Sequence, residues 1–126
     1  MDNPQPFKYA NNKGYIQAVL FGVTPDLMAT YKEKINTAIN WGLYKPKTDA
    51  WCEDIYVDPQ ARGCGVGEEL FQQLLTHCVV NQVRRMIGHF SPSIDNYNPK
   101  MTISWYKRLG FNIHDKKGFC FVTKDL

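Results

Sequence analysis

Three glycines close together, Gly63, Gly65 and Gly67, limit the possible folds of this chain more than any other part of its sequence. The segment before them, Ile55-Tyr56-Val57, is typical of a strand, and the apolar residues after them recur at helical spacing up to Val79. Glycines let backbone N–H groups approach a ligand closely, and a helix N-terminus adds unsatisfied donors and about half a positive charge. The stretch therefore predicts either a tight strand-to-helix turn or a cradle for an anion such as a diphosphate.

Two common phosphate-binding motifs do not fit this loop. A P-loop has Lys and then Ser or Thr after its last glycine, whereas this chain has Glu68 and Glu69. The dinucleotide fingerprint requires the spacing G-x-G-x-x-G, whereas the spacing here is G-x-G-x-G. The loop therefore indicates a strand–loop–helix unit of another kind.

The remaining sequence alternates between strand-like and helix-like patterns. We expect strands at 7–10, 15–22, 50–57, 86–90, 111–114 and 119–123. Helices are expected at 24–41, from the glycine loop through Val79, and at 101–109, with Thr24 as N-cap and Gly110 as the stop signal. Segments 42–48 and 91–99 are expected to be loops. The order β-β-α-β-α-β-α-β-β predicts an α/β fold, in which helices flank a mixed central sheet, as a single domain over residues 1–126.

Composition excludes several classes of function. The 126 residues contain 15 Lys+Arg against 12 Asp+Glu, and this net charge of +3 is too mild for a nucleic-acid binder. No apolar run approaches the roughly 18 residues of a membrane span, and the N-terminus lacks the pattern of a secretion signal. We therefore expect a cytoplasmic protein with neither nucleic acid nor membrane as a partner. Reduced cysteines and no metal are expected from the spacing of Cys52, Cys64, Cys78 and Cys120.

Two segments together resemble one enzyme superfamily. Val57-Asp58-Pro59 followed by Arg62-Gly63-Cys64-Gly65-Val66-Gly67 is similar to the acetyl-CoA motif of GNAT-type N-acetyltransferases, Gln/Arg-x-x-Gly-x-Gly/Ala. Downstream, Trp105-Tyr106-Lys107-Arg108-Leu109-Gly110-Phe111 resembles the Tyr-x-x-Leu-Gly-Phe element of the same superfamily. The two motifs occur in the family's order, and the resemblance covers the chain from about Ala50 to the C-terminus.

This resemblance implies that acetyl-CoA is the co-substrate. It would lie in a V-shaped opening between the strands at 50–57 and 86–90, and an amine would attack its thioester directly. The loop amides would hold the pyrophosphate, the edge of the first strand would pair with the pantetheine arm, and the N–H of Val57 would stabilise the oxyanion. The implied cofactor-binding residues are Ile55, Tyr56, Val57, Arg62, Gly63, Cys64, Gly65, Val66 and Gly67.

The resemblance places Tyr106 as the general acid that protonates the departing thiolate, although an aromatic residue in an amphipathic helix can also serve packing alone. The general base stays open. His89 lies on a strand where some relatives have a catalytic glutamate, and its ordinary pKa near 6.5 suits the role. Glu53 and Asp54 are rivals, of which strand alternation would let only one face the opening. Water is a further alternative.

The helix expected at 24–41 departs from the family, which normally has a tight connection between the hairpin and the motif strand. The part that shapes the acceptor site is therefore absent or rebuilt from this helix. The leading hypothesis is an acetyl-CoA-dependent N-acetyltransferase acting on a primary amine of a small molecule or a protein. The alternative is a catalytically weak or inactive CoA-binding protein that binds or inhibits a protein partner, such as a host protein. A homodimer is also compatible with the resemblance.

Overall fold

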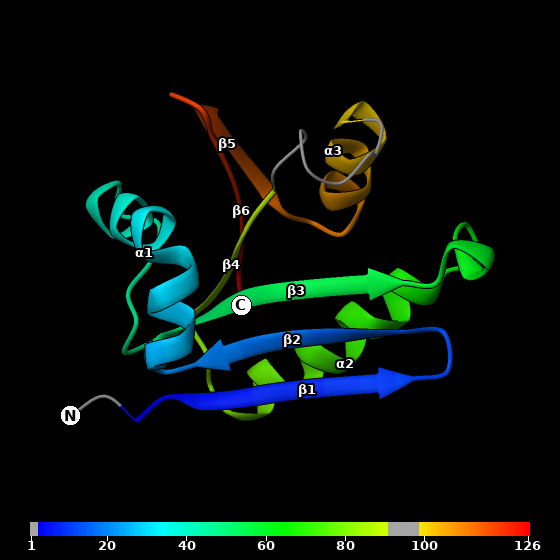
Figure 1. Ribbon diagram of the computed structural model, residues 1–126, viewed down its shortest axis with the longest axis horizontal. Helices are drawn as coiled ribbons and strands as arrows, with labels where there is room; N and C mark the ends of the chain where they lie inside the picture. Colours follow the sequence, from blue (N-terminus) through cyan, green and yellow to red (C-terminus); the bar gives the residue numbers. More distant parts are fainter. Residues whose placement is uncertain (1–2, 91–98) are drawn as a thin grey trace.

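The computed structural model describes residues 3–90 and 99–126, with the side chains of 99–102 left aside. The elements occur in the predicted order (Figure 1): β1 (Gln5–Asn11), β2 (Gly14–Leu20), α1 (Pro25–Asn40), β3 (Asp49–Val57), the short 3-10 helix η1 (Pro59–Ala61), α2 (Val66–Val80), β4 (Arg85–His89), α3 (Pro99–Arg108), β5 (Asn112–Lys116) and β6 (Phe119–Asp125). The α/β class is therefore confirmed. Within the described residues, none of the helices combines the length and apolarity needed to cross a membrane.

Two boundaries follow from simple backbone chemistry. The predicted N-cap of α1 is confirmed, because the Thr24 hydroxyl accepts a hydrogen bond of 3.1 Å from the N–H of Leu27, with Pro25 in the first turn. At α3, the expectation of a loop through residue 99 is wrong at its last residue, since the helix begins at Pro99, a position that suits proline. The rest of that expected loop, 91–98, lies outside the described residues.

The six strands form one mixed sheet in the order β1-β2-β3-β4-β6-β5. All neighbouring strands are antiparallel except β3 and β4, which are parallel. These two pair only where Asp49–Cys52 faces Arg85–Gly88. Beyond Cys52, β3 continues to Val57 while β4 turns away (Figure 1), so the expected V-shaped opening is present between them.

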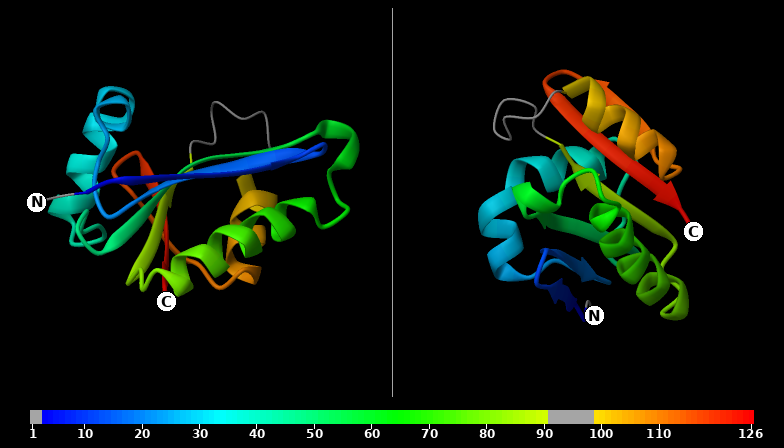
Figure 2. Two further views of the ribbon diagram at one scale, coloured as in Figure 1. Left: turned by 90° about the horizontal axis from the view of Figure 1, so that it is seen from below. Right: turned by 90° about the vertical axis from the view of Figure 1, so that its right-hand side faces the viewer.

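Helices cover both faces of the sheet (Figure 2). One face packs against α2 and α3 in a cluster that includes Ile16, Ala50, Leu70, Leu74 and Met86. The opposite face packs against α1 in a second cluster that includes Leu27, Ile35, Trp51, Ile87 and Phe121. Because both faces are covered, neighbouring residues of β2 to β4 are buried on opposite sides. The helix that departs from the family pattern is thus an integral part of the core.

A β-bulge interrupts the pairing of β2 with β3. Gln17 pairs with Asp54 and the next residue, Ala18, pairs with Cys52, so Glu53 is an extra residue in β3. A bulge bends its strand and changes the direction of the side chains beside it. This one lies at the point where β3 leaves β4.

Candidate active site

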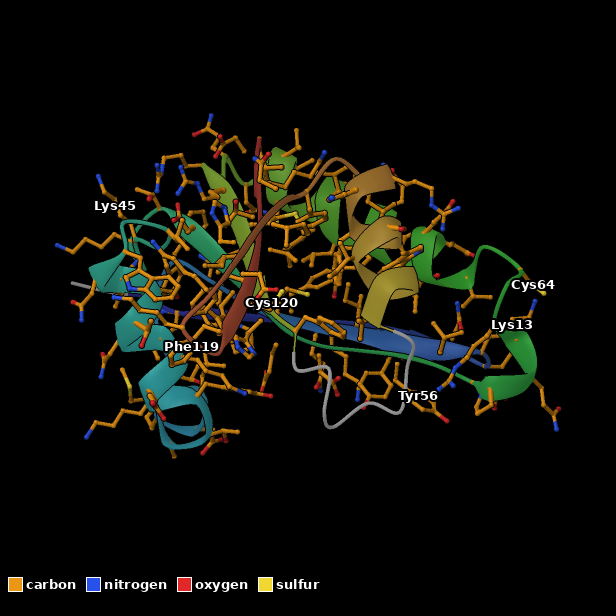
Figure 3. The ribbon with its side chains drawn as sticks, turned by 90° about the horizontal axis from the view of Figure 1, so that it is seen from above. Lys13, Lys45, Tyr56, Cys64, Phe119 and Cys120 are labelled. Atoms are coloured by element: carbon orange, nitrogen blue, oxygen red, sulfur yellow. The ribbon has the colours of Figure 1, made fainter. Side chains whose placement is uncertain are left out.

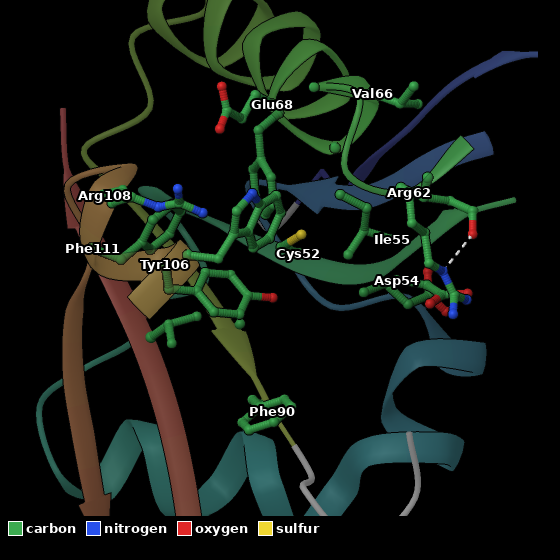
Figure 4. A pocket seen from close by; sticks show the side chains of 18 of the residues that line it. Cys52, Asp54, Ile55, Arg62, Val66, Glu68, Phe90, Tyr106, Arg108 and Phe111 are labelled. Atoms are coloured by element: carbon green, nitrogen blue, oxygen red, sulfur yellow. Dashed lines mark hydrogen bonds between the residues drawn. The ribbon is translucent and has the colours of Figure 1, made fainter. Parts of the chain in front are cut away.

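A cavity of about 540 Å³ occupies the opening between β3 and β4 (Figure 4). Its wall contains all four predicted catalytic candidates, Glu53, Asp54, His89 and Tyr106. It also contains most of the residues that the resemblance implied for the cofactor: Ile55, Val57, Arg62, Gly63, Gly65, Val66 and Gly67. Residues from β3, the glycine loop, α2, β4 and α3 therefore meet around one space.

Two of the implied residues lie elsewhere. The ring of Tyr56 is on the outer face of the sheet, 43% exposed and stacked on Tyr15 with 5.7 Å between ring centroids. Cys64 is exposed at the outer end of the loop (Figure 3). Alternation along β3 explains the first case, because Ile55 and Val57 face the cavity and the residue between them faces away.

The backbone of β3 has one edge turned towards the cavity. The N–H of Asp58 donates to the carbonyl of Lys13 at 2.7 Å, so the peptide groups of Tyr56 and Asp58 face β2. Those of Ile55 and Val57 must then face the opening. In agreement, the carbonyl of Val57 accepts a hydrogen bond of 3.2 Å from Nε of Arg62 (Figure 4). An extended ligand lying in the cavity would meet backbone donors and acceptors along this edge.

The glycine loop leads directly into the first turn of α2. Gly63 and Gly65 have φ of 80° and 81°, the left-handed region in which a side chain is strained. Gly65 is the N-cap of α2, so the N-cap residue has no side chain to accept a hydrogen bond from the first N–H groups of the helix. These amides and the positive end of the helix dipole are suited to an anionic group.

The bulge decides which carboxylates line the cavity. The expectation that only one of Glu53 and Asp54 faces the opening is wrong, because the extra residue breaks the alternation and both line the wall. Asp54 is held by the hydroxyl of Tyr15, which donates to Oδ2 at 2.8 Å. Burial, followed by the charges of Asp54 and Asp26, raises the pKa of Glu53.

Helix α1 lies beside this end of the cavity, although none of its residues is part of the wall. The hydroxyl of Tyr31 donates a long hydrogen bond of 3.5 Å to the backbone carbonyl of Glu53. The negative charge of Asp26 contributes to the raised pKa of the Glu53 side chain. The positive charge of Lys34, on the same helix, contributes to the lowered pKa of His89. That this helix rebuilds the acceptor end stays a prediction.

His89 lies deeper, with its ring edge-on to Phe121 at 5.2 Å and to Phe119 at 6.0 Å between centroids. Its Nε2 is buried and has no hydrogen-bond partner among the described residues. Burial, with a smaller contribution from Lys34, lowers the pKa of His89 to about 4. The imidazole is therefore neutral at neutral pH, and it is a weaker base than an ordinary histidine.

Tyr106 extends from α3 towards the middle of the cavity (Figure 4). Its ring also packs against Phe71, Trp105 and Phe111, with centroids 6.0, 5.1 and 5.5 Å away. The motif predicted the tyrosine and contained Trp105 and Phe111 without giving them a role, and it did not include Phe71 or Cys52, which also line the cavity. Their apolar character marked them only as core residues.

All four cysteines are free, and burial raises the pKa of the Cys52 thiol to about 12. In the part of the chain that the structure describes, no group of three or more His, Cys, Asp or Glu side chains is placed to hold a metal ion.

Comparisons with known proteins agree with this geometry. The family model described as "Acetyltransferase (GNAT) domain" matches residues 27–113, well over half of the chain. A comparison with curated proteins gave no match.

Several solved structures share the fold at low sequence identity. An acetyltransferase from Thermus thermophilus is 17% identical with a TM-score of 0.60, and the match covers 90% of this chain and 56% of that protein. The PaiA N-acetyltransferase from Thermoplasma acidophilum, solved in complex with coenzyme A, is 12% identical with a TM-score of 0.63, covering 96% of this chain and 61% of that one. The anti-CRISPR protein AcrVA5 is 12% identical with a TM-score of 0.62, covering 95% and 98% of the two chains.

The chain thus spans little more than half the length of the first of these acetyltransferases and nearly the whole length of AcrVA5. The family match rests on the segment that contains the glycine loop, the divergent strands and the Tyr106 helix. We conclude that this chain belongs to the GNAT acetyltransferase domain family.

Proposed function

We propose that this protein transfers an acetyl group from acetyl-CoA to a primary amine by direct attack. The strongest support is that three features border one cavity: the free backbone edge of β3, the N-terminus of α2 with glycine as its N-cap, and the Tyr106 side chain. A thioester carried on a long arm with a diphosphate at its far end has groups that suit the helix N-terminus, the strand edge and the Tyr106 hydroxyl. Among the acetyltransferases that share the fold, one was solved with coenzyme A.

The proposed binding mode uses the backbone more than side chains. The loop amides from Arg62 to Gly67 would hold the pyrophosphate, assisted by the dipole of α2. The peptide groups of Ile55 and Val57 would pair with the pantetheine arm in the manner of an added strand. The thioester would then lie near the point where β3 and β4 separate, beside Glu53 and Tyr106.

The proposed chemistry needs one base and one acid. Glu53 would take a proton from the bound ammonium, directly or through water, and the amine nitrogen would attack the thioester carbonyl. The N–H of Val57 would stabilise the resulting oxyanion. When the C–S bond breaks, the Tyr106 hydroxyl would protonate the thiolate, and the nitrogen would lose its second proton to solvent. Tyr106 would then recover a proton from solvent, and Glu53 would release the one that it took. His89, neutral in this site, would offer a hydrogen bond rather than act as the principal proton acceptor.

Direct attack is favoured over an acetyl-cysteine intermediate. Cys52 is the cysteine that lines the cavity. Its pKa of about 12 keeps the thiol protonated at neutral pH, and a protonated thiol is a poor nucleophile. The carboxylates of Glu53 and Asp54 beside it favour an acceptor that arrives as a cation.

A second candidate is a CoA-binding protein that acts on a protein partner without turnover. It is favoured by the match to nearly the full length of an anti-CRISPR protein, but only the fold is shared at that identity. Both functions use the same cavity, so they differ in turnover and not in CoA binding.

A thiol-release assay with a panel of amines tests the proposal against this candidate. We expect turnover by the wild type and, in Tyr106→Phe, a kcat lower by about tenfold or more with unchanged affinity for CoA in calorimetry. Tyr9→Phe is the matched control, since Tyr9 packs against the core outside the cavity. CoA binding without turnover on any amine would support the second candidate, and a native protein that gives no heat with CoA would contradict both.

A further inference from the structure

The space above Gly67 is already filled by the indole of Trp105. A Cβ atom placed on Gly67 would lie 2.8 Å from Cζ2 of Trp105, 3.4 Å from Cη2 and 3.6 Å from Cε2. Separations below 3.0 Å are essentially never seen for real Cβ atoms, so one of the two residues would have to move. The acetyl-CoA motif that this loop resembles accepts glycine or alanine at this position, but here the position has room for glycine alone.

The indole has little freedom to move aside. Its ring lies 5.2 Å from Phe71 of α2 and 5.1 Å from Tyr106, between centroids, and Phe71 also contacts Phe111 at 5.6 Å. Closely packed rings of this kind resist displacement, because each has its contacts on several sides. Trp105 therefore touches the first turn of α2 on one side and the candidate acid on the other.

We infer that the contact between Trp105 and Gly67 sets the position of Tyr106 relative to the anion-binding loop. Trp105 is then a positioning residue for the proposed acetyl transfer, on which this inference rests. Trp105 and Tyr106 are consecutive in α3, so a shift of the indole away from α2 also moves the phenol. The N–H of residue 67 would remain in an alanine variant. The cost of the added methyl group should therefore appear in the transfer step and not in CoA binding.

A double-mutant cycle tests this inference with Gly67→Ala, Trp105→Phe and the variant that combines them. Phenylalanine lacks the outer ring atoms Cζ2 and Cη2, the two closest to the added methyl group. We expect Gly67→Ala to lower kcat by about tenfold with an unchanged dissociation constant for CoA, because small displacements of a reacting group are costly. In the Trp105→Phe background, which itself loses about threefold in kcat, the same substitution should cost almost nothing.

Thermal unfolding gives a second readout that does not depend on turnover. Overpacking should lower the Tm of Gly67→Ala by about 5 °C in the wild-type background and much less in the Trp105→Phe background. Trp41→Phe is the matched control, since Trp41 packs against Phe119 and Phe121 away from the cavity and should leave the cost of Gly67→Ala unchanged.

The possible outcomes separate this inference from the proposed function. An active wild type in which the two substitutions multiply, or in which Gly67→Ala weakens CoA binding with kcat intact, overturns the inference alone. A wild type that binds CoA but turns over no amine overturns the proposed function and with it the role of Trp105 in transfer. In that case the Tm values of the same four proteins still show whether a side chain at position 67 clashes with Trp105.

Discussion

Burial acts in opposite directions on two ionisable side chains that line the same cavity. It raises the pKa of Glu53 and lowers the pKa of His89 to about 4. Both shifts disfavour the charged form, as expected when a group loses contact with water. The carboxylate thus becomes a stronger base and the imidazole a weaker one. The sequence named both residues as candidates but could not rank them, because the ranking depends on their surroundings in the folded chain.

Glu53→Gln should lower kcat by about a hundredfold while leaving the affinity for CoA unchanged, since only the proton acceptor is removed. In the wild type, kcat/KM should fall with decreasing pH as Glu53 becomes protonated, at a pH above the ordinary carboxyl value of about 4.3. His89→Gln is the control and should keep this acidic limb. Loss of the limb in His89→Gln, with retention in Glu53→Gln, would reverse the two assignments.

His89 should also make stability depend on pH. Its pKa is near 6.5 in the unfolded chain and about 4 in the folded one, so the unfolded state binds more protons between these values. Stability is therefore fully present above pH 6.5 and declines as the pH falls towards 4. Urea unfolding should show that wild type loses about 2 kcal/mol more than His89→Gln between pH 7 and pH 4.5.

His114 must be separated from this effect, because burial and the charges of Arg85 and Lys116 lower its pKa as well. A His114→Gln variant measured in parallel removes that contribution. Equal losses of stability in wild type and His89→Gln would show that His89 does not titrate as its burial implies.

In strand β3, the sequence pattern predicted the strand itself but not the irregularity within it. Its alternating residues correctly predicted a strand that runs into the glycine loop. The bulge at Glu53 was not predictable, because it exists only in the register between β3 and β2, strands separated in sequence by the whole of α1. The same holds for Trp105 and Gly67, whose contact joins two helices. Local periodicity contains no information about either pairing.

The start of β3 is fixed by a buried carboxylate. Asp49 accepts hydrogen bonds from the N–H of Lys45 at 2.8 Å, from the hydroxyl of Thr48 at 2.9 Å, and from Nε and Nη2 of Arg84 at 3.1 and 3.0 Å. This ties the loop before β3 to the residue before β4, at the end of the paired segment opposite the opening.

Asp49→Ala should therefore destabilise the protein by about 3 kcal/mol or more in urea unfolding, because it leaves buried donors without an acceptor. Asp125→Ala is the comparison, since Asp125 also pairs with an arginine, Arg85, but its side chain is 70% exposed. That variant should lose at most about 1 kcal/mol. Similar losses in both variants would contradict a structural role specific to Asp49.

Seen entire, the molecule is a mixed sheet with a helix layer on each side and one gap between its parallel strands. The order of elements followed from periodicity, and the gap followed from the family resemblance of the loop and the Tyr106 helix. That α1 would cover the second face and bring Tyr31 near Glu53 and Lys34 near His89 did not follow, since packing direction depends on all the strands together.

A ligand that fills this gap should stabilise the whole chain. At a coenzyme A concentration of 100 times its dissociation constant, the free energy of unfolding should rise by about 2.7 kcal/mol. Scanning calorimetry should show this as a Tm higher by several degrees. Adenosine, which lacks the diphosphate and the pantetheine arm, is the control and should leave the Tm nearly unchanged. An equal shift with adenosine would mean that the loop and strand edge are not the main contacts.

Along the end of β3, successive peptide groups point alternately to β2 and to the cavity. The N–H of Tyr56 faces β2 within the sheet, whereas those of Ile55 and Val57 face the cavity and a ligand bound there. Replacing single amides with esters deletes one N–H at a time without altering any side chain. The ester at position 56 should lower the stability of the fold, whereas the esters at positions 55 and 57 should weaken the binding of the ligand. Binding affinity plotted against position would then alternate with a period of two residues.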